Sequence, residues 1–180
     1  MTAITGQNGA GKTTLAQILC GLARQTRGHI LIDGKKARAA VRRRGIYYCG
    51  NDTSTQFFTA SVAEELLLNT ELTEESKDRA RILLKELGLY EYRDAHPSAM
   101  SGGQKLRLAI ACAIFSGRRI LILDEPTSGL DGQNMSLIAE RLKSEARNGR
   151  TILVITHDHE LIESCCDNGV EVGTKPSEAQ

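Results

Sequence analysis

The segment from Gly6 to Thr13 has the residue types and spacing to bind phosphate groups. It reads Gly-Gln-Asn-Gly-Ala-Gly-Lys-Thr, which fits the full pattern of a glycine-rich phosphate-binding loop. Glycines let the backbone turn so that successive amide groups point at phosphate oxygens, and a following helix adds its positive N-terminal end. The pattern predicts that Lys12 bridges the outer phosphates of a nucleotide and that the Thr13 hydroxyl holds Mg²⁺.

An ordinary glycine-rich turn is the alternative interpretation of this loop. It would require the full pattern, a preceding strand and a following helix to coincide by accident. We therefore expect a nucleotide site formed by Asn8, Gly9, Ala10, Gly11, Lys12, Thr13 and Thr14.

Two carboxylates follow an apolar run later in the chain. Residues 120–123 read Ile-Leu-Ile-Leu and precede Asp124 and Glu125. Because open α/β sheets bind their ligands at the carboxyl ends of their strands, this pair should lie at the ligand edge of a buried strand. We predict that Asp124 organises a magnesium shell and that Glu125 orients or deprotonates an attacking water. Most acidic pairs after strands are surface turns, so the prediction depends on the phosphate loop.

His157 also follows a strand end, Ile155-Thr156, and should lie on the same rim of the sheet. There an imidazole donor could contact a terminal phosphate and stabilise developing charge. A lone histidine is more often structural, and we give His159 that interpretation.

Composition limits the possible classes of function. The chain has 180 residues, 41% of them hydrophobic, which suits one domain with a sub-domain. A net charge of +1 favours neither a nucleic-acid binder nor an enzyme for acidic substrates. No apolar run is long enough to cross a bilayer, so we expect a soluble, cytoplasmic chain whose membrane role comes through a partner.

The apolar pattern predicts alternating strands and helices in the first part of the chain. Residues 3–5 should form a short strand, and Leu15, Ile18, Leu19 and Leu22 should line one face of a helix. A turn is expected at Asp33-Gly34 and a strand at residues 46–49. We interpret the basic run 42–44 as a solvated face.

The middle of the chain reads as helical from about residue 61 to 115. Ser61 with Glu64 predicts a capping box, and Thr73 should begin a second helix that ends at Gly88. Strand patterns return at residues 120–123 and 151–155, separated by a helix near 132–148. This alternation predicts a parallel sheet with helices packed on it and an inserted helical sub-domain.

The tetrad Ser101-Gly102-Gly103-Gln104 begins a helix with Ser101 as N-cap, so it predicts a second anion site. Together with the motifs above, it makes the chain resemble a nucleotide-binding subunit of the ABC (ATP-binding cassette) family. The resemblance runs from Gly6 to about Asp158. It implies a head-to-tail dimer in which two ATP molecules lie between protomers and each tetrad serves the opposite subunit's nucleotide.

The same resemblance assigns roles to further residues. It implies that Glu125 is the catalytic carboxylate, that His157 senses the terminal phosphate, and that Ser128 and Asp131 lie at the dimer interface. It also implies ATP and Mg²⁺ as cofactors, a second ATPase subunit, a transmembrane transporter subunit, and no nucleic acid. The expected location is the cytoplasmic face of the cell membrane.

Three departures from the family pattern stand out. Met100 replaces the usual leucine before Ser101, a swap that conserves volume. Asn51 stands where a glutamine that contacts magnesium is expected, and Gln56 is the alternative occupant. The antiparallel strand layer that usually precedes the phosphate loop, with its adenine-stacking aromatic residue, should be largely missing. This suggests a fragment, a shortened chain or a mis-started gene, with a sheet edge left uncovered and low stability.

The resemblance implies a P-loop NTPase core within a single α/β domain at residues 1–173. We expect this core at about 1–60 and 117–173, the helical sub-domain at about 61–116, and a disordered tail at 174–180. The strand at residues 170–172 should be all that remains of the sheet's C-terminal part.

Residues 51–65 resemble the ATPases of energy-coupling-factor importers, which take up vitamins and metal ions. In that interpretation Phe57 and Phe58 could contact a membrane partner, and the equally weighted alternative is sub-domain core. The predicted function is ATP hydrolysis that drives transmembrane transport. The alternatives are a soluble ABC ATPase of DNA repair or translation, which would need a long coiled coil or a second cassette, and a nucleotide-binding remnant without turnover.

Overall fold

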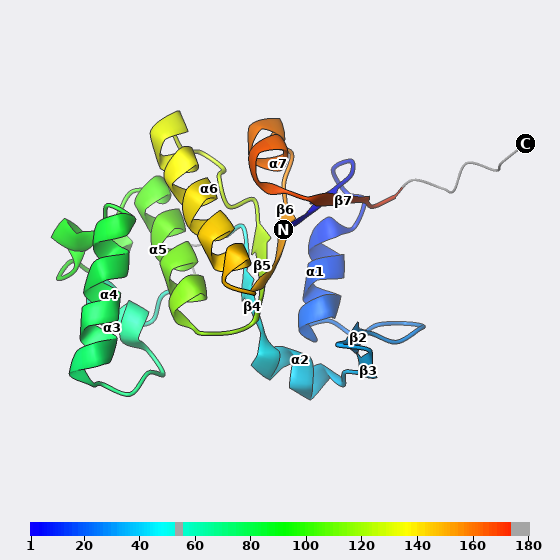
Figure 1. Cartoon of the computed structure of the whole chain (residues 1–180), viewed down its shortest axis with the longest axis horizontal. Coiled ribbons are helices and arrows are strands. Elements are labelled where there is room, and N and C mark those ends of the chain that lie inside the picture. Colours follow the sequence, from blue (N-terminus) through cyan, green and yellow to red (C-terminus); the bar gives the residue numbers. More distant parts are fainter. Residues whose placement is uncertain (53–55, 174–180) are drawn as a thin grey trace, which may run out of the picture.

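The computed structural model describes residues 1–52 and 56–173, which build a five-stranded parallel sheet with helices on both faces (Figure 1). The strands run in the order β4 (Ile46–Cys49), β5 (Ile120–Asp124), β6 (Thr151–Ile155), β1 (Thr2–Thr5) and β7 (Asn168–Glu171). Every neighbouring pair is parallel. The predicted parallel sheet is confirmed, and the tail predicted at 174–180 lies outside the described residues.

Alternate residues of the strands face different helices. Ile122 and Ile155 point to one side, where they pack in a cluster with Ala16 and Cys20 of helix α1 (Lys12–Cys20). The neighbouring residues Leu121, Leu123, Ile152 and Val154 point to the other side, into a larger cluster with the remaining long helices. Burial on both faces explains why these strands read as continuous apolar runs.

A two-stranded antiparallel hairpin follows α1. Its strands are β2 (Leu31–Ile32) and β3 (Lys35–Lys36), and Asp33 and Gly34 join them with φ angles of 51° and 74°. Positive φ at both central residues is the requirement of a type I′ hairpin turn, which favours an Asp-Gly pair. The turn predicted at this pair is confirmed.

Two local predictions for this region were wrong. Leu22 lies beyond the end of α1 with 59% of its surface exposed, because the helix stops at Gly21, whose φ is 78°. Arg42, expected on a solvated face, is only 4% exposed within helix α2 (Ala39–Gly45). Its guanidinium donates to the carbonyl oxygens of Ala37 and Ile18, so it ties α2 to α1.

The helical sub-domain contains α3 (Val62–Leu67), α4 (Glu74–Glu86), two short 3₁₀ turns (Tyr90–Tyr92 and Pro97–Ala99) and α5 (Gly102–Phe115). Ser61 caps α3 as predicted, but the Glu64 carboxylate accepts from the Ala60 amide instead of completing the box. Thr73 caps α4, and its reciprocal partner is Ser76. Among the described residues, no helix is both long and apolar enough to cross a bilayer.

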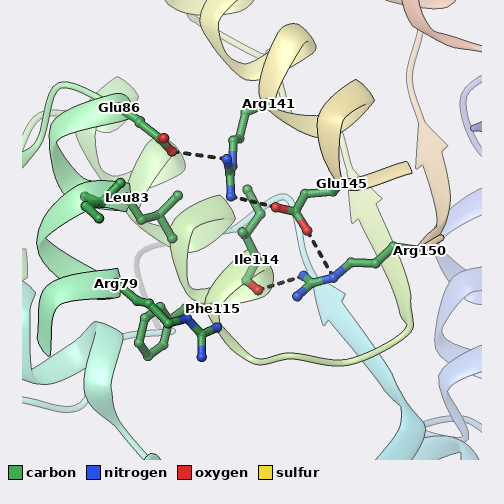
Figure 2. Close-up of a pocket in the computed structure, with 9 residues that line it drawn as sticks. Arg79, Leu83, Glu86, Ile114, Phe115, Arg141, Glu145 and Arg150 are labelled. Carbon is green, nitrogen blue, oxygen red and sulfur yellow. Dashed lines mark hydrogen bonds and ion pairs between the residues drawn. The ribbon is translucent and has the colours of Figure 1, made fainter. Parts of the chain in front are cut away.

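An ion network around the buried Glu145 joins this sub-domain to helix α6 (Gly132–Arg147) (Figure 2). In the chain, α6 is followed by β6 and helix α7 (His159–Cys165). The Glu145 carboxylate is 2.7 Å from Arg141 Nη2 and 3.1 Å from Arg150 Nε. Arg141 also reaches Glu86 of α4 at 3.2 Å, and Arg150 donates to the Ile114 carbonyl at the end of α5. These side chains line a cavity of about 210 Å³ between α4, α5 and α6.

Replacing Glu145 with alanine should destabilise the fold by about 3–5 kcal/mol, because two guanidinium groups would lose a carboxylate that is only 5% exposed. Denaturant unfolding of the purified chain measures this free energy. Glu140→Ala is the matched control, since Glu140 pairs with Lys143 on the exposed face of the same helix and should change nothing measurable. Equal free energies of unfolding for the two variants would contradict a stabilising role of the ion network.

Candidate functional site

The loop between β1 and α1 forms the base of the candidate site. Gly6 has a φ of 138°, and a Cβ atom there would lie 2.3 Å from the Val172 carbonyl oxygen, so no side chain fits. Gly11, with a φ of 97°, turns the chain into the first residue of α1. The loop thus ends at the N-terminus of a nine-residue helix, whose free amides and dipole favour an anion.

Lys12 lies over this loop. Its ammonium nitrogen donates to the carbonyl oxygens of Gly6, at 2.7 Å, and Gln7, at 3.1 Å, and the residue is only 8% exposed. The charge is therefore held at one place beside the loop by the main chain. An ammonium group in this position can meet negatively charged phosphate oxygens with its donors.

Asp124 ends strand β5 and is 3% exposed. Its Oδ2 atom accepts a hydrogen bond from Thr13 Oγ1 at 2.8 Å and one from the Tyr48 hydroxyl at 3.2 Å. Two of the residues predicted to hold magnesium, Thr13 and Asp124, are thus in direct contact. Burial and the neighbouring Asp124 carboxylate raise the pKa of Tyr48, which keeps its hydroxyl protonated as a donor.

Glu125 adopts a left-handed backbone conformation with a φ of 53°, which is uncommon for a residue with a side chain. Its amide still donates to the Ile155 carbonyl at 2.8 Å, so the residue remains attached to β6. Its carboxylate accepts from Thr156 Oγ1 at 3.3 Å and lies 3.9 Å from His157 Nε2. The turn after β5 therefore separates the two carboxylates and directs Glu125 toward the end of β6.

One cavity of about 370 Å³ collects most of the predicted residues. It is lined by Asn8, Gly9, Gly11, Lys12, Thr13, Thr14, Asn51, Asp124, Glu125 and His157. Ala10 of the loop is not among the lining residues. Asn51 lines the cavity, whereas the Gln56 amide donates to the Gly50 and Asp52 carbonyls, so the structure favours Asn51 over Gln56 for the predicted glutamine position.

The donor set at this cavity fits magnesium and a triphosphate. The Thr13 hydroxyl and the Asp124 carboxylate are hard oxygen ligands, and Mg²⁺ in nucleotide sites takes one or two carboxylates together with phosphate oxygens. Within residues 1–52 and 56–173, no group of three or more His, Cys, Asp and Glu side chains could hold a metal by itself.

The remaining predicted residues lie elsewhere on the chain. Ser101 is the N-cap of α5, as predicted, and forms a capping box in which Gln104 Oε1 accepts from the Ser101 amide at 2.8 Å. Ser128 and Asp131 are exposed in the loop before α6, and Asp131 caps that helix. None of these residues, nor Gly102 and Gly103, lines the phosphate-loop cavity of its own chain.

Sequence reasoning missed two residues at the site. Tyr48, in the neighbouring strand β4, donates to Asp124, and Thr156, which is completely buried, donates to Glu125. Parallel pairing of β4 with β5 could have suggested Tyr48, because the last residues of adjacent strands meet at one edge of a sheet. Thr156 directly precedes the predicted histidine but carries no motif of its own.

Comparisons with known proteins place these motifs in a family. The family model described as "ABC transporter" matches residues 1–128. A putative ABC transporter ATP-binding protein of Treponema denticola is 44% identical over 165 residues, which cover 91% of this chain and 33% of that protein. The chain thus spans about a third of the length of this relative.

Two solved structures are similar in fold. CbiO1 of Clostridium perfringens, described as part of the ABC transporter complex CbiONQ, has a TM-score of 0.79 at 35% identity, with 95% of this chain and 72% of that chain covered. A dimeric ATP-binding cassette, MJ0796 bound to ADP and phosphate, has a TM-score of 0.84 at 26% identity, with 96% and 80% covered. The matched sequence model, the relatives and the shared fold show that this chain belongs to the ABC transporter family.

Proposed function

We propose that this chain binds ATP together with Mg²⁺ and hydrolyses it to ADP and phosphate. The observation that carries the proposal is the single cavity shared by the phosphate loop, Asp124, Glu125 and His157. Release of inorganic phosphate from MgATP by the purified chain tests it, and Glu125→Gln should slow that release about 10²–10⁴-fold. An unchanged rate in this variant would count against the proposed chemistry.

In the proposed reaction the loop amides and Lys12 bind the outer phosphates, and Thr13 and Asp124 are the residues that would hold Mg²⁺, which when bound would supply positive charge next to the phosphate oxygens. Glu125 accepts a proton from a water molecule as the water oxygen bonds to the terminal phosphorus. The bond from that phosphorus to the bridging oxygen breaks, and ADP leaves with the electron pair. His157 donates a hydrogen bond to the transferring group.

The proposed active state is a head-to-tail dimer with a second ATPase subunit. Ser101, Gly102, Gly103 and Gln104 would contact the nucleotide of the partner, and Ser128 and Asp131 would lie at the interface. Two facts support this arrangement: none of these residues lines the cavity of its own chain, and the similar structure MJ0796 is dimeric. The main-chain amides at the start of the 14-residue helix α5 suit a phosphate of the nucleotide that the partner subunit binds.

We further propose that the hydrolysis powers transport through a transmembrane subunit at the cytoplasmic face of the membrane. The similarity to CbiO1, part of an ABC transporter complex, supports this role. Phe58 is 81% exposed, which suits contact with a partner, whereas Phe57 packs against the larger core cluster that the sub-domain shares with the sheet. Of the two residues considered for that contact, Phe58 is therefore the stronger candidate.

Asn51→Ala should impair coupling to the membrane partner more than ATP binding. Asn51 is exposed and lines the cavity, whereas in the proposed site the amides of the phosphate loop and Lys12 contribute most of the phosphate contacts. We expect the affinity of the purified variant for a fluorescent ATP analogue to stay within about twofold. Stimulation of ATP hydrolysis by native membranes that carry the partner subunit should fall. A loss of nucleotide affinity equal to the loss of that stimulation would refute this placement.

A further inference from the structure

A chain of side-chain contacts joins the start of α5 to the start of α6. Arg107, one turn beyond the Ser101–Gln104 tetrad, donates through Nη1 to Asn134 Oδ1. The side-chain nitrogen of Asn134, Nδ2, in turn donates to the two carboxylate oxygens of Asp131, at 3.0 Å and 2.9 Å. The two segments that the proposed function places at the dimer interface are therefore connected within one chain.

Packing of Leu130 against the tetrad supports the same connection. A Cβ atom added at Gly103 would lie 3.1 Å from Leu130 Cδ2, which puts the tetrad against the loop that carries Asp131. The main-chain N–H of Asn134 also donates to Asp131 Oδ1, with an N···O distance of 2.8 Å. These bonds with Asn134 lower the pKa of the Asp131 carboxyl, so the group stays ionised. Asp131 is thus held as a charged, oriented group although it is exposed to solvent.

Asparagine suits position 134 for a chemical reason. Its carbonyl oxygen accepts from a guanidinium, and its NH₂ group donates to a carboxylate, so the two neighbours fix the orientation of the amide. An aspartate at this position would keep the contact with Arg107 but would repel Asp131. An alanine would break both contacts.

We propose that Arg107 and Asn134 are positioning residues. They orient the Asp131 carboxylate for its contact with the partner subunit and fix its position relative to the tetrad. This inference rests on the proposed dimeric ATPase. The hydrogen bonds from Arg107 to Asn134 and from Asn134 to Asp131 connect α5 to the loop before α6 within one chain, so that α5 and Asp131 move together. Loss of Asn134 should therefore weaken the ATP-bound dimer without weakening the first encounter of one chain with ATP.

The test compares Asn134→Ala and Asn134→Asp in a Glu125→Gln background, with Ser136→Ala on the exposed face of α6 as the control. Analytical ultracentrifugation with MgATP gives the dimer dissociation constant. We expect it to rise about tenfold for Asn134→Ala, the loss typical of a hydrogen bond to a charged group, and further for Asn134→Asp. Affinity of the dilute monomer for a fluorescent ATP analogue should stay within about twofold.

Asn134→Asp separates a positioning role from a structural one. Position 134 is the third residue of α6, where a negative charge stabilises a helix, so the melting temperature should not fall although dimerisation does. In a double-mutant cycle, Asn134→Ala should add nothing to Asp131→Ala, because both act through the same carboxylate. Additive effects, or a dimer constant unchanged by either Asn134 variant, would overturn the inference.

Failure of the inference differs from failure of the proposed function. If the Glu125→Gln parent binds MgATP and dimerises while the Asn134 variants behave like it, only the positioning role is wrong. If the parent neither binds MgATP nor dimerises, the dimeric ATPase itself is wrong, and the positioning role is overturned with it.

Discussion

The Glu125→Gln variant is expected to bind MgATP while hydrolysing it about 10²–10⁴-fold more slowly than the parent chain, the range that a positioned general base contributes. Glutamine keeps the size and polarity of the side chain, so the cavity should keep its shape. It cannot accept a proton from water at neutral pH. Because the nucleotide is bound but not consumed, the ATP-bound dimer should accumulate.

The position of the Glu125 carboxylate is the reason that we expect a large fall in the rate of hydrolysis. Its left-handed backbone turns the carboxylate away from Asp124 and toward Thr156 and His157, which lie 3.3 Å and 3.9 Å from its two oxygens. In the proposed reaction, Asp124 would hold the metal and Glu125 would face the attacking water. Uncommon backbone conformations of this kind are concentrated at functional sites.

Phosphate release from MgATP measures the rate of hydrolysis, and gel filtration with MgATP measures the accumulation of the dimer. Glu160→Gln is the matched control, because Glu160 is an exposed carboxylate in the first turn of α7 and has no contact with the cavity. The control should turn over like the parent and should not accumulate the dimer. Continued hydrolysis by Glu125→Gln would show that another group accepts the proton.

Lys12→Ala should reduce the affinity for ATP by about 10²-fold or more. In the proposed site the ammonium group bridges two phosphates, and each hydrogen bond to a charged group contributes about 1.5–3 kcal/mol. The variant also removes a positive charge that is only 8% exposed, where water weakens its attraction for phosphate less than at the surface. Titration calorimetry with MgATP measures the loss.

The control for this experiment is Lys77→Ala. Lys77 pairs with Glu74 on the surface of α4, far along the chain from the loop, and its removal should leave the affinity unchanged. Melting temperatures without nucleotide should be compared first, to separate lost binding from lost folding. If folded Lys12→Ala binds MgATP as tightly as Lys77→Ala does, the phosphate loop is not the nucleotide site.

Short contiguous motifs account for how well the sequence predicted the site. The phosphate loop needs only local glycines and a following helix, and Asp124 is placed by the apolar strand directly before it. A single rule, that the carboxyl ends of parallel strands share an edge, then brings residues from positions 12, 124 and 157 into one cavity. The parallel sheet follows in the same way from alternating apolar runs and helices.

The errors and omissions depend on contacts between distant segments. Arg42 looks like a surface residue in sequence, but carbonyl groups of two segments satisfy its guanidinium in the interior. Leu22 continues a helical pattern that a left-handed glycine has already ended. Tyr48 and the link between Arg107 and Asn134 involve single polar side chains, which carry no periodic signal. The roles of the tetrad and of Ser128 stay predictions, since they concern a second subunit.

A crystal structure of the chain with Mg²⁺ and a non-hydrolysable ATP analogue would show whether the phosphate loop and the two carboxylates meet one triphosphate. We expect the terminal phosphate to lie about 3 Å from Lys12 Nζ, with the metal beside Thr13 and Asp124 and the Glu125 carboxylate facing the phosphorus. A triphosphate bound elsewhere on the chain, or a Glu125 side chain that points away from it, would contradict the proposed ATPase site.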